Sequence, residues 1–286
     1  MRFVSIFTIL ILFLLFSCTN ENDISSKIVV EGWIEENKPP IVMLHYTYTF
    51  NQNVEHNIED IIAEHLITWA KVTIDNNEDE EILIGQLDMD IIPPYKYSTA
   101  RMIGEVGKKY KIKVEYNGET VSATTRLLEK VKIDSIVVTN LHDMDYDVRV
   151  YFNDFNTTEE HYYALLYKYL GDKQYSITQM GITKSSLGNN GSLSIIANRR
   201  INSLITDSVT NIFFTEGDSI MFKLCHIDST SYEIWNSYLS QTFSTNIPIA
   251  TTNNIESNIE NGLGYWCGMN GTEQFVVIKH DTTYVY

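Results

Sequence analysis

The stretch 109-KYKIKVEYNGETVSATT-125 decides the fold class of this chain. Apolar or aromatic side chains stand at every second position from Tyr110 to Tyr116, with lysine or glutamate between them. Period two is the repeat of a β-strand that has one buried and one solvated face. Asn117-Gly118 then supplies two residues that tolerate positive φ in a tight hairpin turn. The stretch therefore predicts an antiparallel hairpin in a sheet with one buried face.

Shorter runs upstream predict further strands of the same kind. Ile28–Ile34 and Ala70–Ile74 are rich in branched residues, and the acidic stretch Asp75–Glu81 after the second run predicts a hairpin turn. Between these strands, apolar residues at helical spacing over 54–66 predict a short helix. We therefore predict a mainly β chain in which residues 27–128 form an immunoglobulin-like or transthyretin-like β-sandwich.

The remaining residues, 129–286, predict a second β-rich domain with one short helix. Two segments rich in Asn, Ser and Thr, 183–211 and 241–261, predict long loops in this domain. The strand candidates are 133–139, 147–152, 161–169, 219–227 and 274–279.

The helix of the second domain has a clear sequence signal. Thr230 and Glu233 have the spacing of a capping box, in which each side chain bonds the backbone of the other residue. Tyr232, Trp235 and Leu239 then recur on one helical face. We expect this face to pack against the core.

Residues 1–17 predict a signal peptide. Arg2 precedes an apolar run, Ile6–Phe16, which as a helix would be about 16 Å long and so about half the thickness of a bilayer core. That length is typical of a signal peptide and too short for a spanning helix. The run ends in Leu15-Phe16-Ser17-Cys18, which resembles the lipobox of bacterial lipoproteins, although Phe16 is bulkier than usual.

The lipobox predicts that Cys18 is lipidated. Cleavage before Cys18 would leave a diacylglycerol on the thiol and a further acyl chain, such as palmitate, on the amine. Several acyl chains anchor a protein stably where one does not. Residues 18–26 are the lipidated cysteine and a short polar tether. We therefore expect an exported protein that is held on a membrane by lipid.

The charge of the chain argues against nucleic acid as a partner. The full chain carries 21 Lys and Arg against 37 Asp and Glu. Removal of residues 1–17 takes away Arg2 alone, so the mature chain has 20 − 37 = −17 charges. A phosphate backbone would be repelled by this charge, so we expect no nucleic-acid partner.

Two cysteines remain besides the lipidated one. Cys225 and Cys267 both lie in apolar runs and in neither a CxxC nor another metal-ligand spacing. One interpretation is a disulfide, which an oxidising compartment would permit. The other, which we favour, is a pair of buried thiols that act as small apolar side chains.

Asp143, Asp145 and Asp147 are the strongest candidates for a metal site. Carboxylates at positions one, three and five of a loop bind Ca²⁺ in an EF-hand. Here Val148 stands at the sixth position, where the EF-hand turn requires glycine, and Asp154 stands at the twelfth in place of glutamate. An ordinary solvated strand or turn is therefore the favoured interpretation, and we expect no cofactor.

Six pieces, in order along the chain, resemble a known family. They are IVVEGWI at 28–34, AKVTID at 70–75, IGEVGKKYKIKVEYNG at 103–118, KIDSI at 132–136, EGDSI at 216–220 and SNIENGLGYW at 257–266. Their order and spacing resemble the Gram-negative lipoproteins of the domain-of-unknown-function 4249 family. Two features depart from that pattern, the helical segment at 54–66 and Cys267.

The resemblance implies a β-sandwich lipoprotein on the outer membrane, at the cell surface or on the periplasmic face. It also implies an accessory or binding role beside a TonB-dependent receptor in nutrient uptake. The family has no established catalytic residues, so none is carried over to this chain.

The residues themselves leave other functions open. The chain has no G-x-S-x-G, H-E-x-x-H, P-loop or Rossmann motif, so we expect a non-enzymatic protein. The alternatives are a structural or adhesive surface lipoprotein and, third, a hydrolase with an unrecognised site.

Overall fold

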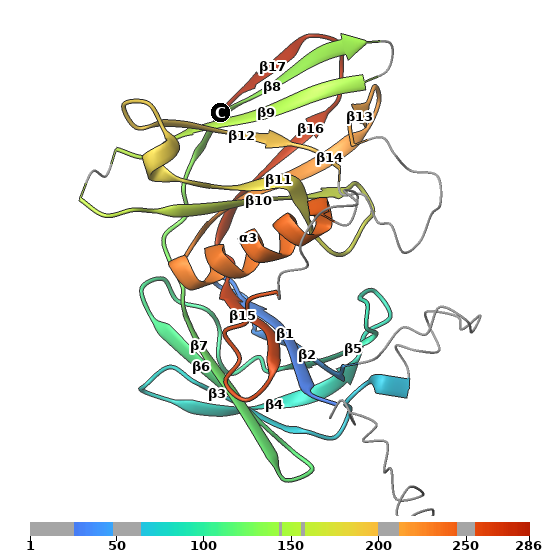
Figure 1. Ribbon diagram of the computed structural model, residues 1–286, viewed down its shortest axis with the longest axis vertical. Coiled ribbons are helices and arrows are strands. Elements are labelled where there is room, and N and C mark those ends of the chain that lie inside the picture. Colours follow the sequence, from blue (N-terminus) through green and yellow to red (C-terminus); the bar gives the residue numbers. More distant parts are fainter. Residues whose placement is uncertain (1–25, 48–63, 143–144, 156–157, 200–211, 245–254) are drawn as a thin grey trace, which may run out of the picture.

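The computed structural model describes residues 26–47, 64–142, 145–155, 158–199, 212–244 and 255–286. In these residues the chain is mainly β, as the sequence predicts. They form two β units stacked along the long axis of the molecule (Figure 1). Within the described part of the chain, no helix is both long enough and apolar enough to cross a membrane.

The first unit is an eight-stranded sheet that takes seven strands from the N-terminal half of the chain. The sheet order is β15-β1-β2-β5-β4-β3-β6-β7, and β15 also contacts β7. The strands are β1 (Ile28–Ile34), β2 (Ile41–Tyr46), β3 (Lys71–Asp75), β4 (Glu80–Leu87), β5 (Tyr95–Ser98), β6 (Lys109–Tyr116), β7 (Glu119–Arg126) and β15 (Leu263–Gly268).

The hairpin predicted from the opening stretch is confirmed. β6 and β7 pair antiparallel across Asn117 and Gly118, which have φ values of 49° and 83°. Tyr110, Ile112 and Val114 are buried, and the lysines between them are exposed. Because neighbouring side chains point to opposite faces of the sheet, the alternation in sequence becomes an alternation in burial.

The acidic stretch after β3 is a turn only in part. Asn76 makes the turn, because its side-chain oxygen accepts hydrogen bonds from the backbone N–H groups of Glu78 and Asp79. The chain then returns as β4 from Glu80, so the prediction of a turn as far as residue 81 extended it too far.

Strand β15 joins the first sheet from near the C-terminus. It runs parallel to β1, with Val30 opposite Gly264 and Gly32 opposite Trp266. Trp266 is fully buried in the core of the first unit, and its indole N–H donates to the backbone oxygen of Tyr110 at 2.9 Å. The predicted second domain, 129–286, therefore contains a strand of the first sheet.

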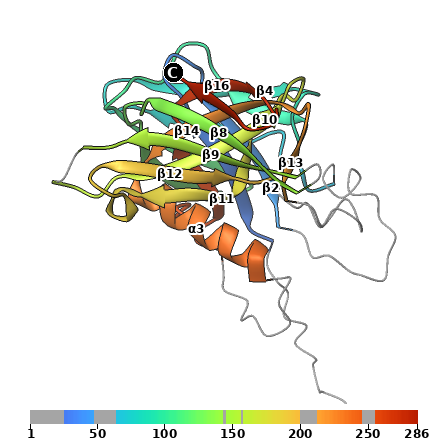
Figure 2. The ribbon, with the colours of Figure 1, turned by 90° about the horizontal axis from the view of Figure 1, so that it is seen from above.

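The second unit is a sandwich of two sheets. One sheet has the order β11-β10-β14-β16, the other β12-β9-β8-β17, and β13 pairs with β9. Viewed from above, β8, β9 and β12 lie across β10, β11 and β14 (Figure 2). The strands are β8 (Ile133–His142), β9 (Asp145–Asn153), β10 (Tyr162–Tyr169), β11 (Ser176–Lys184), β12 (Ser192–Ala197), β13 (Phe214–Thr215), β14 (Ser219–Ile227), β16 (Gly271–Val277) and β17 (Thr282–Val285).

The structure tests parts of the two predicted long loops, 183–211 and 241–261, and little of the predicted helix at 54–66. The predicted loop 183–211 is wrong at β12, where alternate side chains of SLSIIA are buried against the sandwich core. A short 3₁₀ helix, η1 (Ser185–Leu187), precedes this strand. The predicted loop at 241–261 is wrong at its start, because residues 241–244 belong to the helix Ser229–Ser244, and its residues 245–254 lie outside the described residues. Most of the predicted helix at 54–66 also lies outside them.

The predicted helix of the second domain is confirmed as α3 (Ser229–Ser244). Its cap differs from the prediction, because the helix begins at Ser229, two residues earlier than an N-cap at Thr230 would place it. The Asp228 carboxylate accepts the backbone N–H of Ser231 at 2.8 Å, and its other oxygen accepts the Thr125 hydroxyl at 3.0 Å. Asp228 thus caps α3 and ties it to β7 of the first unit.

We call the boundary between the two units the seam. Helix α3 lies there, between the sheet that contains β10 and β14 and the first unit (Figure 1). Tyr232, Trp235 and Leu239 pack there, as predicted, with Trp33 of β1. The buried residues of this seam core are Ala164, Leu166, Ile177, Cys225, Ile227, Leu239, Cys267 and Met269. Burial of apolar surface from both units holds them together.

Candidate functional site

The sequence-predicted lipid and metal residues lie partly outside the structure. Cys18 and Asp143 are not among the described residues, so lipidation of Cys18 stays a prediction. Asp145 and Asp147 lie on strand β9, where the extended backbone does not wrap around a cation as an EF-hand loop does. Among the described residues, no group of three or more His, Cys, Asp or Glu side chains could hold a metal ion.

Cys225 and Cys267 are both buried as free thiols in the seam core. Burial raises the pKa of each thiol to about 12, so neither is a thiolate at neutral pH. The Cys225 thiol donates to the backbone oxygen of Met269 at 3.5 Å. In this structure the two thiols are therefore not joined, and each is buried among apolar side chains.

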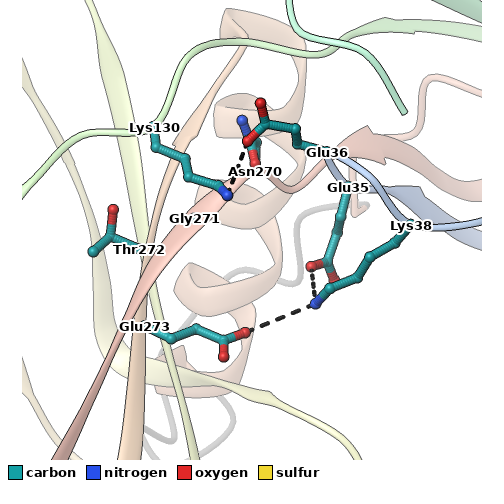
Figure 3. Close-up of a pocket in the computed structure, with 8 residues that line it drawn as sticks. All are labelled: Glu35, Glu36, Lys38, Lys130, Asn270, Gly271, Thr272 and Glu273. Atoms are coloured by element: carbon teal, nitrogen blue, oxygen red, sulfur yellow. Dashed lines mark hydrogen bonds and ion pairs between the residues drawn. The ribbon is translucent and has the colours of Figure 1, made fainter. Parts of the chain in front are cut away.

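A charged cleft of about 340 Å³ opens at one side of the seam. Figure 3 shows Lys38 between Glu35 and Glu273, and Lys130 directed at Glu36. We call this group the junction cleft. It is lined by Glu35, Glu36, Lys38, Lys130, Asn270, Gly271, Thr272 and Glu273.

Three segments far apart in the chain bring these residues together. Glu35 to Lys38 form the turn between β1 and β2, where Asn37 has a positive φ of 59° and donates its N–H to Gly104. Lys130 lies on the connection between the units. That connection is fixed to the start of β16, because Thr272 donates to the Val131 oxygen at 2.6 Å.

Glu35 is the centre of the cleft. Its carboxylate accepts from Lys38 and from Lys223, each at 2.7 Å, and the Lys223 side chain is only 3% exposed. Burial alone would raise the pKa of the Glu35 carboxyl, but the two lysines outweigh burial and hold the pKa below its ordinary value. Glu35 is therefore ionised at neutral pH and neutralises a lysine that is out of reach of solvent.

An aromatic ring and a closely packed glycine lie beside Lys223. Its ammonium group lies 5.3 Å from the centre of the Tyr175 ring, a cation–π distance. A Cβ atom on Gly271 would approach Lys223 Cγ to 2.8 Å and Cys225 Sγ to 2.7 Å. Glycine at this position therefore lets β16 lie directly against the lysine stem.

The junction cleft can bind positively or negatively charged groups of a ligand. Its lining residues do not include a nucleophile next to a general base. The net charge of the cleft is close to zero, because three carboxylates face three lysines. They are Glu35, Glu36 and Glu273, and Lys38, Lys130 and Lys223. At the rim, the Lys38 and Glu273 side chains are 55% and 40% exposed and 3.9 Å apart, so solvent or a ligand can reach them. This chemistry is suited to binding and positioning.

Sequence reasoning did not find the junction cleft. One signal was present, because Lys223 is the single charge within the otherwise apolar run IMFKLC of β14. A charge in a buried strand requires a partner. The partner, Glu35, lies 188 residues earlier in the chain, and no local pattern connects the two residues.

Comparison with known proteins gives a family and no function. No curated protein matches the chain. The model of a family described as "Domain of unknown function (DUF4249)" matches residues 17–274, which are most of the 286 residues. The resemblance inferred from six pieces of sequence is thereby confirmed. The chain belongs to the DUF4249 family.

Proposed function

We propose that the protein is a non-enzymatic binding lipoprotein of the outer membrane that assists a TonB-dependent receptor in nutrient uptake. The observation that carries the proposal is Leu15-Phe16-Ser17-Cys18, directly after an apolar run too short to span a bilayer. A lipidated Cys18 would keep the folded units at the membrane without a spanning helix.

Two further observations support a binding role over a catalytic one. The junction cleft is a preformed depression between two units that a buried apolar core holds together. Its titratable groups are engaged in ion pairs with one another, and none is a nucleophile next to a base. Seams between units are common places for binding sites.

The test is an affinity pull-down of the tagged lipidated protein from detergent-solubilised outer membranes. We expect a TonB-dependent receptor in stoichiometric amount. Cys18→Ala is the matched control, because it removes the lipid and leaves residues 27–286 unchanged. The variant should stay unlipidated and recover much less receptor, since it is no longer held at the same membrane.

Two results would contradict the proposal. A clean eluate from lipidated, surface-labelled protein would favour the adhesive alternative. Turnover on a peptide or glycan panel that one carboxylate substitution abolishes would favour the hydrolase alternative.

A further inference from the structure

A second pocket, of about 550 Å³, lies on the second unit. It is formed where β9 ends and β10 begins, together with η1 and the turn before β12. We call it the end pocket. Most of its lining is hydroxyl, amide and carboxyl groups, and a single aromatic ring, Phe155, stands among them.

Phe155 is held open to solvent. Its side chain is 74% exposed, although burial of a phenyl ring is strongly favourable. Asn190 and Gly191 form a two-residue turn with φ values of 51° and 82°. A Cβ on Gly191 would come within 2.7 Å of the Phe155 ring, so glycine lets the ring lie directly on the turn. The ring is thus supported by backbone and exposed to the pocket side.

The base of the end pocket is rigid. The Asp154 carboxylate is 8% exposed and accepts from the Tyr163 hydroxyl at 2.8 Å and from His161 Nδ1 at 3.0 Å. The backbone N–H of Asp154 donates to the Gly191 oxygen at 2.8 Å, which fixes the residue before Phe155 to the turn beneath the ring. The backbone that carries the ring is therefore held in place before a ligand binds.

The rim of the pocket offers hydrogen-bonding groups and two carboxylates, Glu159 and Glu160. Glu160 accepts from the Ser186 and Tyr162 hydroxyls and has Lys184 at 3.4 Å, so its charge is compensated. Asn190 is exposed at the pocket and carries both donors and an acceptor. A ligand that suits this lining has hydroxyl groups around its edge and an apolar face for the ring.

We propose that the end pocket binds a neutral saccharide unit, with Phe155 as the stacking platform and Asn190 as a hydrogen-bonding group. The C–H face of a pyranose ring would lie on the exposed face of the phenyl ring. The sugar hydroxyls would meet the polar rim. The inference names a ligand class for the binding role proposed above, and rests on that proposal only in assuming a binding protein.

The test is saturation-transfer NMR of the detergent-solubilised full chain with a panel of neutral mono- and disaccharides of hexoses and N-acetylhexosamines. Each binding sugar is then titrated against variants. We expect Phe155→Ala to weaken binding roughly three- to tenfold and Phe155→Trp to retain it, because a larger ring still stacks. Trp69→Ala is the matched control: Trp69 is 89% exposed on the first unit, and its loss should leave the affinity unchanged.

A second variant separates a neutral from a cationic ligand. Glu160→Gln keeps an acceptor oxygen and removes the charge, so sugar binding should change by no more than about twofold, with little dependence on salt. Spermidine is the cationic probe, and we expect it not to bind.

Three results would overturn the inference: no saccharide signal at tens of millimolar, binding that Phe155→Ala does not weaken, or spermidine binding that Glu160→Gln abolishes. All of them are obtained without a receptor. A failed pull-down with intact sugar binding would therefore remove the transporter role alone.

Discussion

The core of the first unit and the junction cleft both join segments that are far apart in the chain, but they do so by different forces. In the first unit, β15 inserts Trp266 beside Tyr110, and the contact is almost entirely apolar. In the cleft, Glu35 holds the buried Lys223 through charge. Apolar burial gains stability at every contact, whereas a buried ion pair mostly offsets its own desolvation. The comparison indicates that apolar burial holds β15 in the first sheet, while the ion pair sets how the end of β1 and β14 are aligned.

The largest expected effect is a loss of stability in the apolar core of the first unit. Trp266→Ala should lower the free energy of unfolding by about 3–5 kcal/mol, because it leaves a cavity and removes the hydrogen bond to Tyr110. Urea unfolding followed by circular dichroism measures the change. Trp69→Ala, at a site 89% exposed, should stay within about 0.5 kcal/mol of wild type. A loss below about 1 kcal/mol for Trp266→Ala would mean that β15 is not part of the core.

The next effect is on the buried ion pair. Glu35→Gln should cost about 3 kcal/mol, because Lys223 is left charged and buried without its partner. Adding Lys223→Met to this variant should restore most of the stability, since the methionine needs no counter-charge. A double-mutant cycle in urea measures the coupling. If the two single variants simply added, Glu35 and Lys223 would not depend on each other.

The same pair predicts a dependence on pH. The lowered pKa of Glu35 means that its contribution to stability is complete above the unfolded value of 4.5 and is lost as the pH falls through the folded value. The stability difference between wild type and Glu35→Gln should therefore be constant near neutral pH and shrink below about pH 4.5. Unfolding at a series of pH values from 7 to 3 measures it, and an unchanged difference at pH 3 would contradict the assigned ion pair.

The smallest effect is at the rim of the cleft. The Lys38 side chain is 55% exposed, so Lys38→Ala should cost about 0–1 kcal/mol, even though its ammonium lies 2.7 Å from Glu35. About 1 M NaCl should bring wild type and variant closer together, because salt screens exposed pairs. A loss as large as that of Glu35→Gln would show that Lys38, and not Lys223, is the main partner.

Some strands and the helix α3 could be predicted from sequence, because the periodicity of their apolar residues matches the burial of those residues in the structure. β6, β7 and β14 have one buried face or an apolar run with clear ends, and α3 has its apolar stripe. β4 was not found, because its exposed face carries Ile82 and Ile84, which are 57% and 65% exposed and hide the alternation. The N-cap of α3 was misplaced, since two residues with capping side chains, Asp228 and Thr230, lie close together.

The sequence by itself determined the mainly β class, the family and the core face of α3, because each depends on side chains close together in the chain. It also contains the apolar run Ile6–Phe16 and the sequence Leu15-Phe16-Ser17-Cys18, on which the prediction for Cys18 rests. Only the tertiary structure decided that β15 completes the first sheet, that Glu35 neutralises Lys223, and that Phe155 lies on the Asn190–Gly191 turn. Those contacts join residues that are far apart in the chain, so no local periodicity predicts them. They form only when the two units come together or when the loops of the second unit pack on its sheets.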